Sequence, residues 1–140
     1  SSEVLLVATP EPTSITDAYA LLKTLNRKTD FSVDDAVIKV ITNRVESEEN
    51  GEEIYEKLNI VSSKFLKLKL EYLGHLPLDN TVSNAVIMQK PAISAYPKSN
   101  FSKIITSFAK QLISYEHVNV KEKKGIAQLF SNLIKSRIKK

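Results

Sequence analysis

Three short apolar runs, each followed by a polar or proline-containing segment and then by a helical pattern, most strongly constrain the fold of this chain. The runs cover residues 4–8, 36–41 and roughly 72–76, and their continuous apolar character is typical of buried parallel strands. Helical spacing of apolar residues is found at about 14–25, 51–70, 81–88 and 99–115. Strands that alternate with helices predict an α/β fold with about three parallel strands flanked by helices.

The first strand sets a condition on the whole fold. In a doubly wound sheet it should have neighbours on both sides, whereas three strands alone would leave the apolar run 4–8 at an exposed edge, which favours aggregation. The chain begins Ser1-Ser2-Glu3, without Met, and reaches the strand almost at once. We therefore expect the chain to be cut from a longer protein, or another chain to cover this edge.

The composition excludes several kinds of site. The chain of 140 residues has no cysteine, which excludes disulfides, thiolate metal sites and cysteine nucleophiles. Its three glycines are too far apart for a phosphate-binding loop, and His75 and His117 have no ligand cluster around them. No apolar run approaches the ~18 residues of a membrane span. We expect no catalytic residue and no metal site within this chain.

The C-terminal tail carries the basic charge and a second amphipathic pattern. Residues 121–140 include seven basic side chains and one acidic side chain. Six apolar residues in the tail recur at helical spacing, namely Ile126, Leu129, Phe130, Leu133, Ile134 and Ile138. Such a helix, with lysines at both ends, fits attachment to an anionic membrane surface, which we favour. The alternative is a last helix that packs on the body of the protein.

Polar side chains follow each predicted strand, where ligands bind in open parallel sheets. After the first strand, Ser14 is expected to cap a helix, with Asp17 as the acidic third residue of that helix. Asn43 follows the second strand; its amide could read the edge of an adenine ring or simply form a turn. The third strand ends in a turn that contains Pro77, and Asp79 is expected to cap the next helix.

These segments, in this order, resemble the MinD/ParA-like P-loop ATPases, and among them the flagellar-number regulators of the FlhG (FleN/YlxH) type. The matching segments read TPEPTSITDAY at 9–19, TNRV at 42–45, GHLPLD at 74–79 and VxxAVxxQxP at 82–91. Leu76 stands where the family has Ile, and the phosphate-binding loop is absent. The resemblance covers about 4–115. It implies the C-terminal part of a doubly wound MinD-like domain at 1–116, a linker at 117–124 and a membrane-targeting helix at 125–140.

The resemblance also assigns roles to residues. Residues that would contact adenine are Asn43, Arg44, Pro77, Leu78 and Asp79. Residues at an ATP-dependent dimer interface would be Glu11, near the nucleotide of the facing subunit, Thr13 beside it, and Asp17, which would pair with a lysine of the phosphate loop. The tail residues named above would bind the membrane. None of these roles follows from composition or spacing alone.

The implied function is that of an intact parent protein. It would bind ATP with Mg²⁺, dimerise, attach to the inner face of the cell membrane from the cytoplasm, and control flagellar number or placement. An FlhF-like GTPase and flagellar switch proteins would be its partners. This chain alone should neither hydrolyse ATP nor hold it tightly.

Two other functions are found among proteins of the same wider fold. A ParA-like partition factor could use the basic tail to bind DNA or a partner protein, but phosphate contacts need no apolar face, so we expect no nucleic acid. A glutamine-dependent amidoligase of the same wider fold would need a cysteine nucleophile, which this chain lacks.

Overall fold

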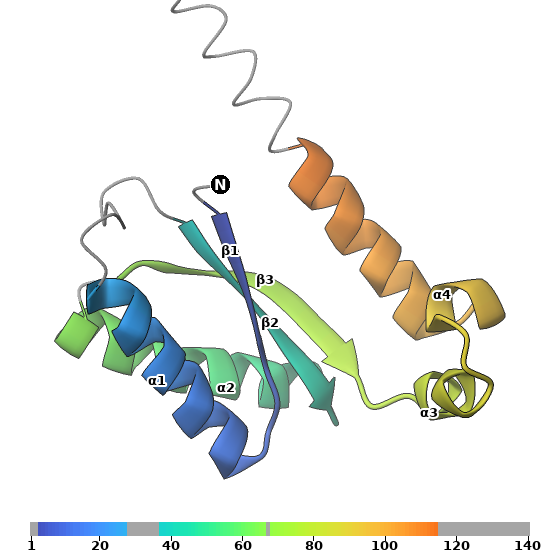
Figure 1. Cartoon of the computed structure of the whole chain (residues 1–140), viewed down its shortest axis with the longest axis horizontal. Helices are drawn as coiled ribbons and strands as arrows, with labels where there is room; N and C mark the ends of the chain where they lie inside the picture. The colour runs from blue at the N-terminus through green and yellow to red at the C-terminus, as the bar shows by residue number, and fades with distance from the viewer. Residues whose placement is uncertain (1–2, 28–36, 67, 115–140) are drawn as a thin grey trace, which may run out of the picture. The chain divides into compact units, whose positions relative to one another are not determined.

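The computed structural model describes residues 3–27, 37–66 and 68–114. The chain divides into two compact units, Ser1–Ser102 and Lys103–Lys140, and each is described by itself. The first unit contains all the strands that the structure describes, and its elements are labelled in Figure 1. In chain order they are β1 (Glu3–Ala8), α1 (Pro12–Arg27), β2 (Val37–Val45), α2 (Glu48–Val61), η1 (Ser62–Leu66), β3 (Leu70–Pro77), α3 (Asn80–Ile87) and α4 (Ala92–Ala95).

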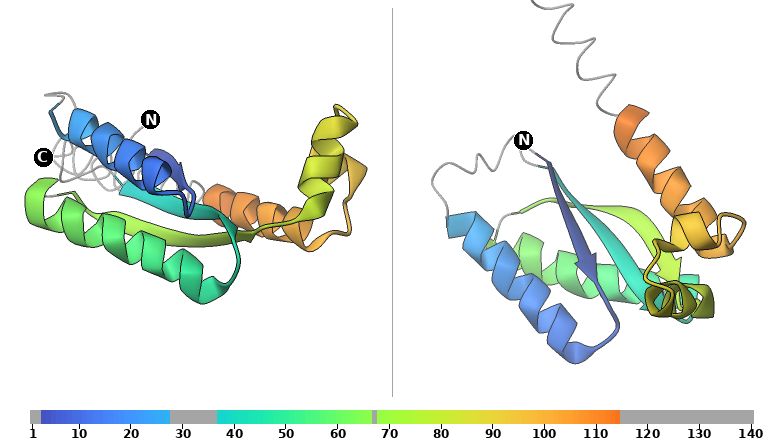
Figure 2. Two further views of the ribbon diagram at one scale, coloured as in Figure 1. Left: turned by 90° about the horizontal axis from the view of Figure 1, so that it is seen from below. Right: turned by 45° about the vertical axis from the view of Figure 1, so that its right-hand side comes forward.

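The three strands form one parallel sheet in the order β1-β2-β3, which confirms the predicted fold class. Helices α1 and α2 connect consecutive strands and pack against the same face, since residues of both share one core cluster. Figure 2 shows the two helices against this sheet from two further directions. Both connections step in the same direction across the sheet, from β1 to β2 and from β2 to β3. Because such connections are almost always right-handed, both helices are expected on one side of the sheet.

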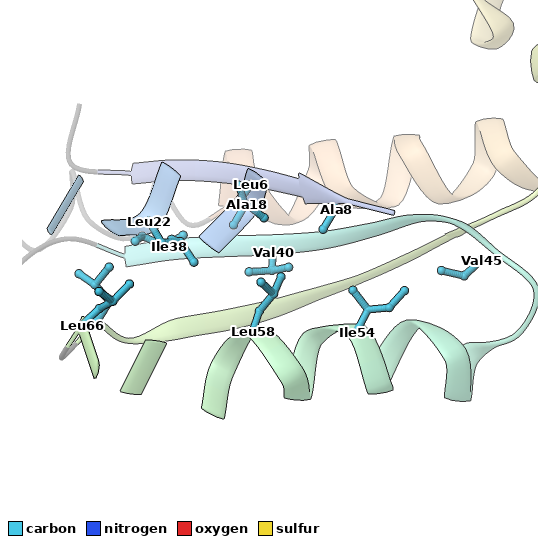
Figure 3. Close-up of a cluster of buried hydrophobic side chains, with 11 residues drawn as sticks. Leu6, Ala8, Ala18, Leu22, Ile38, Val40, Val45, Ile54, Leu58 and Leu66 are labelled. Carbon is cyan, nitrogen blue, oxygen red and sulfur yellow. The ribbon is translucent and has the colours of Figure 1, made fainter. Parts of the chain in front are cut away.

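The core lies between this face of the sheet and the two helices. Figure 3 shows Ile54 and Leu58 of α2 directed toward β2, with Leu58 next to Val40, and with Leu6 of β1 and Leu22 of α1 in the same cluster. Because side chains alternate across a strand, Leu6 and Ala8 of β1 and Ile38 and Val40 of β2 enter this cluster from the same face. The core thus fixes which residues of β2 face α2 and which face away.

The opposite face of β1 and β2 is different. Leu5 and Val7 of β1 are 47% and 49% exposed, and β1 is an edge strand among the strands that the structure describes. Lys39 of β2 is buried, and its Nζ lies 3.3 Å from Oε1 of Glu3 on β1. An ion pair of this kind accounts for a charged residue inside a strand, since a buried charge needs a partner. The predicted apolar edge is therefore present in the described part of the chain.

Helix α1 begins two residues earlier than predicted, so the assignment of Ser14 as its cap was wrong. The first residue of the helix is Pro12, whose missing N–H is of no consequence in a first turn. The carbonyl of Glu11 accepts from the Ser14 and Ile15 amides at 3.0 and 3.3 Å. The Ser14 hydroxyl instead accepts from the Thr9 amide at 3.0 Å, which fixes the loop to the helix.

Helix α2 also differs from its predicted bounds of 51–70. It begins at Glu48, with Ser47 as its cap, and gives way at Ser62 to the π-helical turn η1. A π turn contains one more residue than an α turn and rotates the following side chains. As a result Phe65, expected on the apolar face, is 64% exposed, and Leu66 is buried in its place.

The last helices agree with the prediction more closely. Helix α3 begins after Asp79. The last helix of the described residues covers 100–114, and at its start the Ser99 hydroxyl accepts from the Ser102 amide at 3.2 Å. Helix α4 is an additional short turn that was not predicted. Within the described residues, no helix is both long enough and apolar enough to cross a bilayer. The predicted linker at 117–124 and the tail helix at 125–140 lie outside the described residues.

Candidate functional site

The carboxyl ends of β2 and β3 bring the predicted adenine residues together. Asn43 is paired with Leu76, and Val45 is paired with Pro77. The amide of Leu78 then donates to the carbonyl of Val45 at 3.0 Å, which continues the ladder past the end of β3. Asn43 and Pro77 therefore lie at the same edge of the sheet, which is where open parallel sheets bind their ligands.

Arg44 lies at an irregularity in β2. The register shifts between Asn43 and Val45, so Arg44 has no partner residue on β3, and its φ is 59°. This left-handed conformation costs a residue with a side chain on the order of 1 kcal/mol. The Arg44 amide donates to Oδ1 of Asn43 at 2.9 Å. Bulges of this kind re-aim side chains at sheet edges, and here Arg44 is exposed whereas Asn43 is partly buried.

Asp79 caps helix α3 as the sequence predicts. Its Oδ1 accepts from the Thr81 amide at 2.8 Å and from the Thr81 hydroxyl at 2.7 Å. The hydrogen bond from the Thr81 hydroxyl, followed by that from the Thr81 amide, lowers the pKa of the Asp79 carboxyl below its usual value. Asp79 is therefore held in place as an ionised cap, and any contact with a base would have to leave this cap intact.

A hollow of ≈ 430 Å³, here called the strand-end hollow, lies at this edge. Its lining residues are Pro10, Glu11, Arg44, Glu46, Asn50 and Leu78. Its volume falls within the range of about 300–1,000 Å³ that small-molecule sites have. Of the five predicted adenine residues, Arg44 and Leu78 line it, whereas Asn43, Pro77 and Asp79 lie beside it in the sheet and the following turn.

Sequence reasoning missed three residues of this hollow, namely Pro10, Glu46 and Asn50. Asn50 belongs to the first turn of α2, which was predicted to start only at residue 51. The signal was present, because Ser47 followed by Glu48 and Glu49 is a good helix start. A helix that begins at 48 directs its first turn toward the ends of the strands.

The predicted dimer residues gather around a second hollow, between β1 and α1. This β1–α1 hollow has a volume of ≈ 480 Å³. Glu11, Thr13 and Asp17 are all exposed and all line it. Its remaining lining residues are Leu6, Val7, Thr9, Ser14, Ala18, Leu21 and Arg44. The hollow thus combines an apolar wall with two carboxylates and the Arg44 side chain.

Glu11 is ionised in this setting. Its carboxylate accepts a hydrogen bond from the Thr9 hydroxyl. That bond is the largest cause of the lowering of the Glu11 pKa, and the positive charge of Arg44 adds a smaller effect. Arg44 and Glu11 line both hollows, so the two predicted sites adjoin each other.

These groups suit a ligand that has both a hydrogen-bonding edge and an apolar face. Asn43 offers an amide, and Pro77 and Leu78 offer apolar surface beside it. Among the described residues, no group of three histidine, aspartate or glutamate side chains could hold a metal ion.

Comparison with known proteins gives the chain its relatives. It is 38% identical over 115 residues to the antiactivator FleN of Pseudomonas aeruginosa, an alignment that covers 82% of this chain and 40% of FleN. It is 30% identical over 135 residues to the flagellum site-determining protein YlxH of Helicobacter pylori, covering 94% of this chain and 44% of YlxH. The chain therefore matches the MinD/ParA-like family, close to its FlhG-type members. No protein-family model matches the chain.

Solved structures agree on the MinD-like fold. The cell division ATPase MinD of Pyrococcus furiosus superposes with a TM-score of 0.57 at 19% identity, covering 82% of this chain and 44% of MinD. The septum site-determining protein MinD of Pyrococcus horikoshii, complexed with Mg-ADP, gives 0.56 at 19% identity, covering 80% of this chain and 41% of that one. At this identity the likeness concerns the fold. The chain spans less than half the length of each of these MinD/ParA-like relatives.

Proposed function

We propose that this chain supplies the adenine-binding edge and part of the dimer face of an FlhG-type ATPase that controls flagellar number or placement. The observation that carries the proposal is the pairing of Asn43 with Leu76 and of Val45 with Pro77, which sets an amide beside an apolar turn at the ligand-binding edge. The identity of 38% to FleN supports the same assignment.

In this proposal the residues hold the base and leave the phosphates to other parts of the protein. The Asn43 carboxamide would offer a donor and an acceptor to the edge of adenine, while Pro77 and Leu78 would cover its apolar face. Arg44 and Asp79 would border the base, with Asp79 still capping α3. Bound ATP would supply the negative charge and the cleavable phosphate.

Glu11, Thr13 and Asp17 would form the dimer face in the same proposal. Their support is that all three are exposed and line one hollow, next to the residues proposed for the base. Glu11 contributes to both hollows, which suits a residue that approaches a nucleotide held by the facing subunit. The chain without a phosphate-binding loop would neither hydrolyse ATP nor retain it tightly.

Attachment to an anionic membrane, and with it a peripheral position on the inner face of the cell membrane, rests on the sequence of the tail. Removal of 125–140 should abolish flotation of the chain with vesicles that contain anionic lipid. Binding of duplex DNA with a steep salt dependence would instead favour the partition-factor alternative. Partnership with an FlhF-like GTPase and flagellar switch proteins is implied by the sequence resemblance and is proposed on that basis.

The decisive test changes one atom group of Asn43. The experiment uses the intact FlhG-type protein that the proposal assumes. There, Asn43→Asp keeps the side-chain shape but replaces an amide donor with a carboxylate that only accepts. Adenine needs both a donor and an acceptor, whereas guanine presents two neighbouring N–H donors to a carboxylate. ATP affinity should therefore fall roughly tenfold, while GTP affinity should hold or rise. Fluorescent analogues of both nucleotides measure the ratio.

A matched control is Asn84→Asp, because Asn84 is an exposed asparagine on α3 and lies in neither hollow. It makes the same change of charge away from the site. If the two substitutions shift the ATP-to-GTP ratio equally, or if neither shifts it, Asn43 does not read the base and the proposal is wrong.

A further inference from the structure

A cluster of polar side chains is packed between α2 and the end of the sheet. Thr42 is fully buried, and its hydroxyl lies 3.0 Å from the hydroxyl of Tyr72 on β3. The ring of Tyr72 stacks on that of Tyr55 of α2, with ring centres 4.8 Å apart and planes 21° apart. The Tyr55 hydroxyl donates to the carbonyl of Leu70 at 3.0 Å. Both ring hydroxyls are thus bonded to the sheet.

Gly51 closes this cluster from the helix side. A β-carbon at residue 51 would lie 2.7 Å from the Thr42 hydroxyl, 2.8 Å from the Tyr72 hydroxyl and 3.0 Å from Cβ of His75. Side chains do not make contacts this short, so any residue with a side chain at position 51 would force neighbouring groups to move. The Thr42–Tyr72 pair is therefore enclosed by helix backbone.

The cluster lies beside the irregular part of the β2–β3 ladder. The register shifts between Val40 and Ile41 and again between Asn43 and Val45. Only the segment 41–43 is paired regularly between these shifts. A slip of one residue in a strand turns every side chain to the opposite face. A ladder this short does little by itself to prevent such a slip.

We propose that Thr42 and Tyr72 are positioning residues for Asn43. Their hydrogen bond ties the middle residue of the short ladder to β3, so that Asn43, the next residue, stays beside Leu76 on the opposite face. Gly51 and the Tyr55 ring hold the pair in place from α2. This inference rests on the proposed function, because it concerns how the residue that reads the base is held.

The test compares the two stacked tyrosines. Tyr72→Phe keeps the ring stack but removes the bond to Thr42, whereas Tyr55→Phe keeps the stack and removes a bond to the start of β3, away from Asn43. The Leu78 amide, which donates to Val45, reports the strand ends by hydrogen exchange without any nucleotide. Its exchange should rise roughly threefold to tenfold in Tyr72→Phe, and much less in Tyr55→Phe.

The second readout is the ratio of ATP to GTP affinity. It should fall in Tyr72→Phe and in Thr42→Val, and it should be preserved in Thr42→Ser, which retains the hydroxyl. Circular dichroism verifies that each variant is folded, and Thr42→Val serves if Tyr72→Phe does not fold.

The two proposals fail in different ways. If Asn43→Asp leaves the nucleotide ratio unchanged, the proposed function is wrong, whatever the exchange rates show. If Asn43→Asp changes the ratio but Tyr72→Phe behaves like Tyr55→Phe in both readouts, or if Thr42→Ser behaves like Thr42→Val, the positioning role is wrong.

Discussion

Substitution of Gly51 by alanine sets two well-known effects against each other. In an exposed helix interior, alanine is favoured over glycine by about 1 kcal/mol. At Gly51 the added methyl group would lie 2.7 and 2.8 Å from the Thr42 and Tyr72 hydroxyls, distances at which atoms have to move. Overpacking of a tight interior costs about 1–3 kcal/mol. The net result should be a loss of about 1 kcal/mol in the free energy of unfolding.

Urea unfolding of the full chain, followed by circular dichroism, measures this difference. The control is the same substitution in the Tyr72→Phe background, where one of the two crowded hydroxyls is gone. The loss caused by Gly51→Ala should then shrink by about 0.5 kcal/mol or more, since residues in contact are not additive. A gain of about 1 kcal/mol for Gly51→Ala alone, as in an exposed helix, would refute the close approach of α2 to the sheet.

Three further substitutions test other parts of the first unit by urea unfolding. Leu22→Ala should lose about 2–5 kcal/mol, because Leu22 is fully buried in the core cluster. Ser62→Ala should be neutral or stabilising by up to about 1 kcal/mol, since the buried Ser62 hydroxyl has no hydrogen-bond partner among the described residues. Asp79→Asn should keep the cap and the stability near neutral pH. Because the pKa of Asp79 is lowered in the folded chain, its ionised form stabilises the fold above pH 3.8, and this stability is lost as the pH falls further. The stability of Asp79→Asn should therefore depend less on pH in this acidic range.

The strands were predictable because parallel strands bury both faces and therefore need apolar residues throughout. In β2 every residue from Ile38 to Thr42 is buried, and the two polar ones, Lys39 and Thr42, are bonded to Glu3 and Tyr72. Helix starts were harder to place, because several capping residues lie close together. At α1 the Ser14 hydroxyl does not cap the helix, because it accepts the hydrogen bond from the Thr9 amide. A bond between loop and helix leaves no trace in a local pattern.

The end of α2 could not be predicted for a different reason. Apolar residues at 54, 58, 61, 65 and 68 continue a helical spacing without a break, yet the π turn shifts the buried position from Phe65 to Leu66. Tertiary packing against the core decides this, because Leu66 joins the same cluster as Leu22 and Leu58. Periodicity describes a regular helix and contains no information on an inserted residue.

For the candidate site, the sequence located the edge of the sheet but not its irregularities. That Asn43 and Pro77 share an edge follows from any parallel pairing of the second and third strands. The bulge at Arg44 does not, since arginine has no preference for a positive φ. Nor does the contribution of Asn50, which depends on where α2 begins.

Two energetically unfavourable features lie next to the three regular β2–β3 pairs at 41–43. Together they indicate what stabilises this part of the sheet. Arg44 holds a strained backbone at one end of the ladder, and Gly51 gives up helix propensity beside its middle residue, Thr42. Strain of this kind persists only where the surroundings over-determine the structure, and it gathers at functional sites. Three regular residue pairs cannot supply that constraint, but a helix packed directly on a buried Thr42–Tyr72 bond can. The position of Asn43 is therefore set by the packing of α2 more than by the ladder to which it belongs.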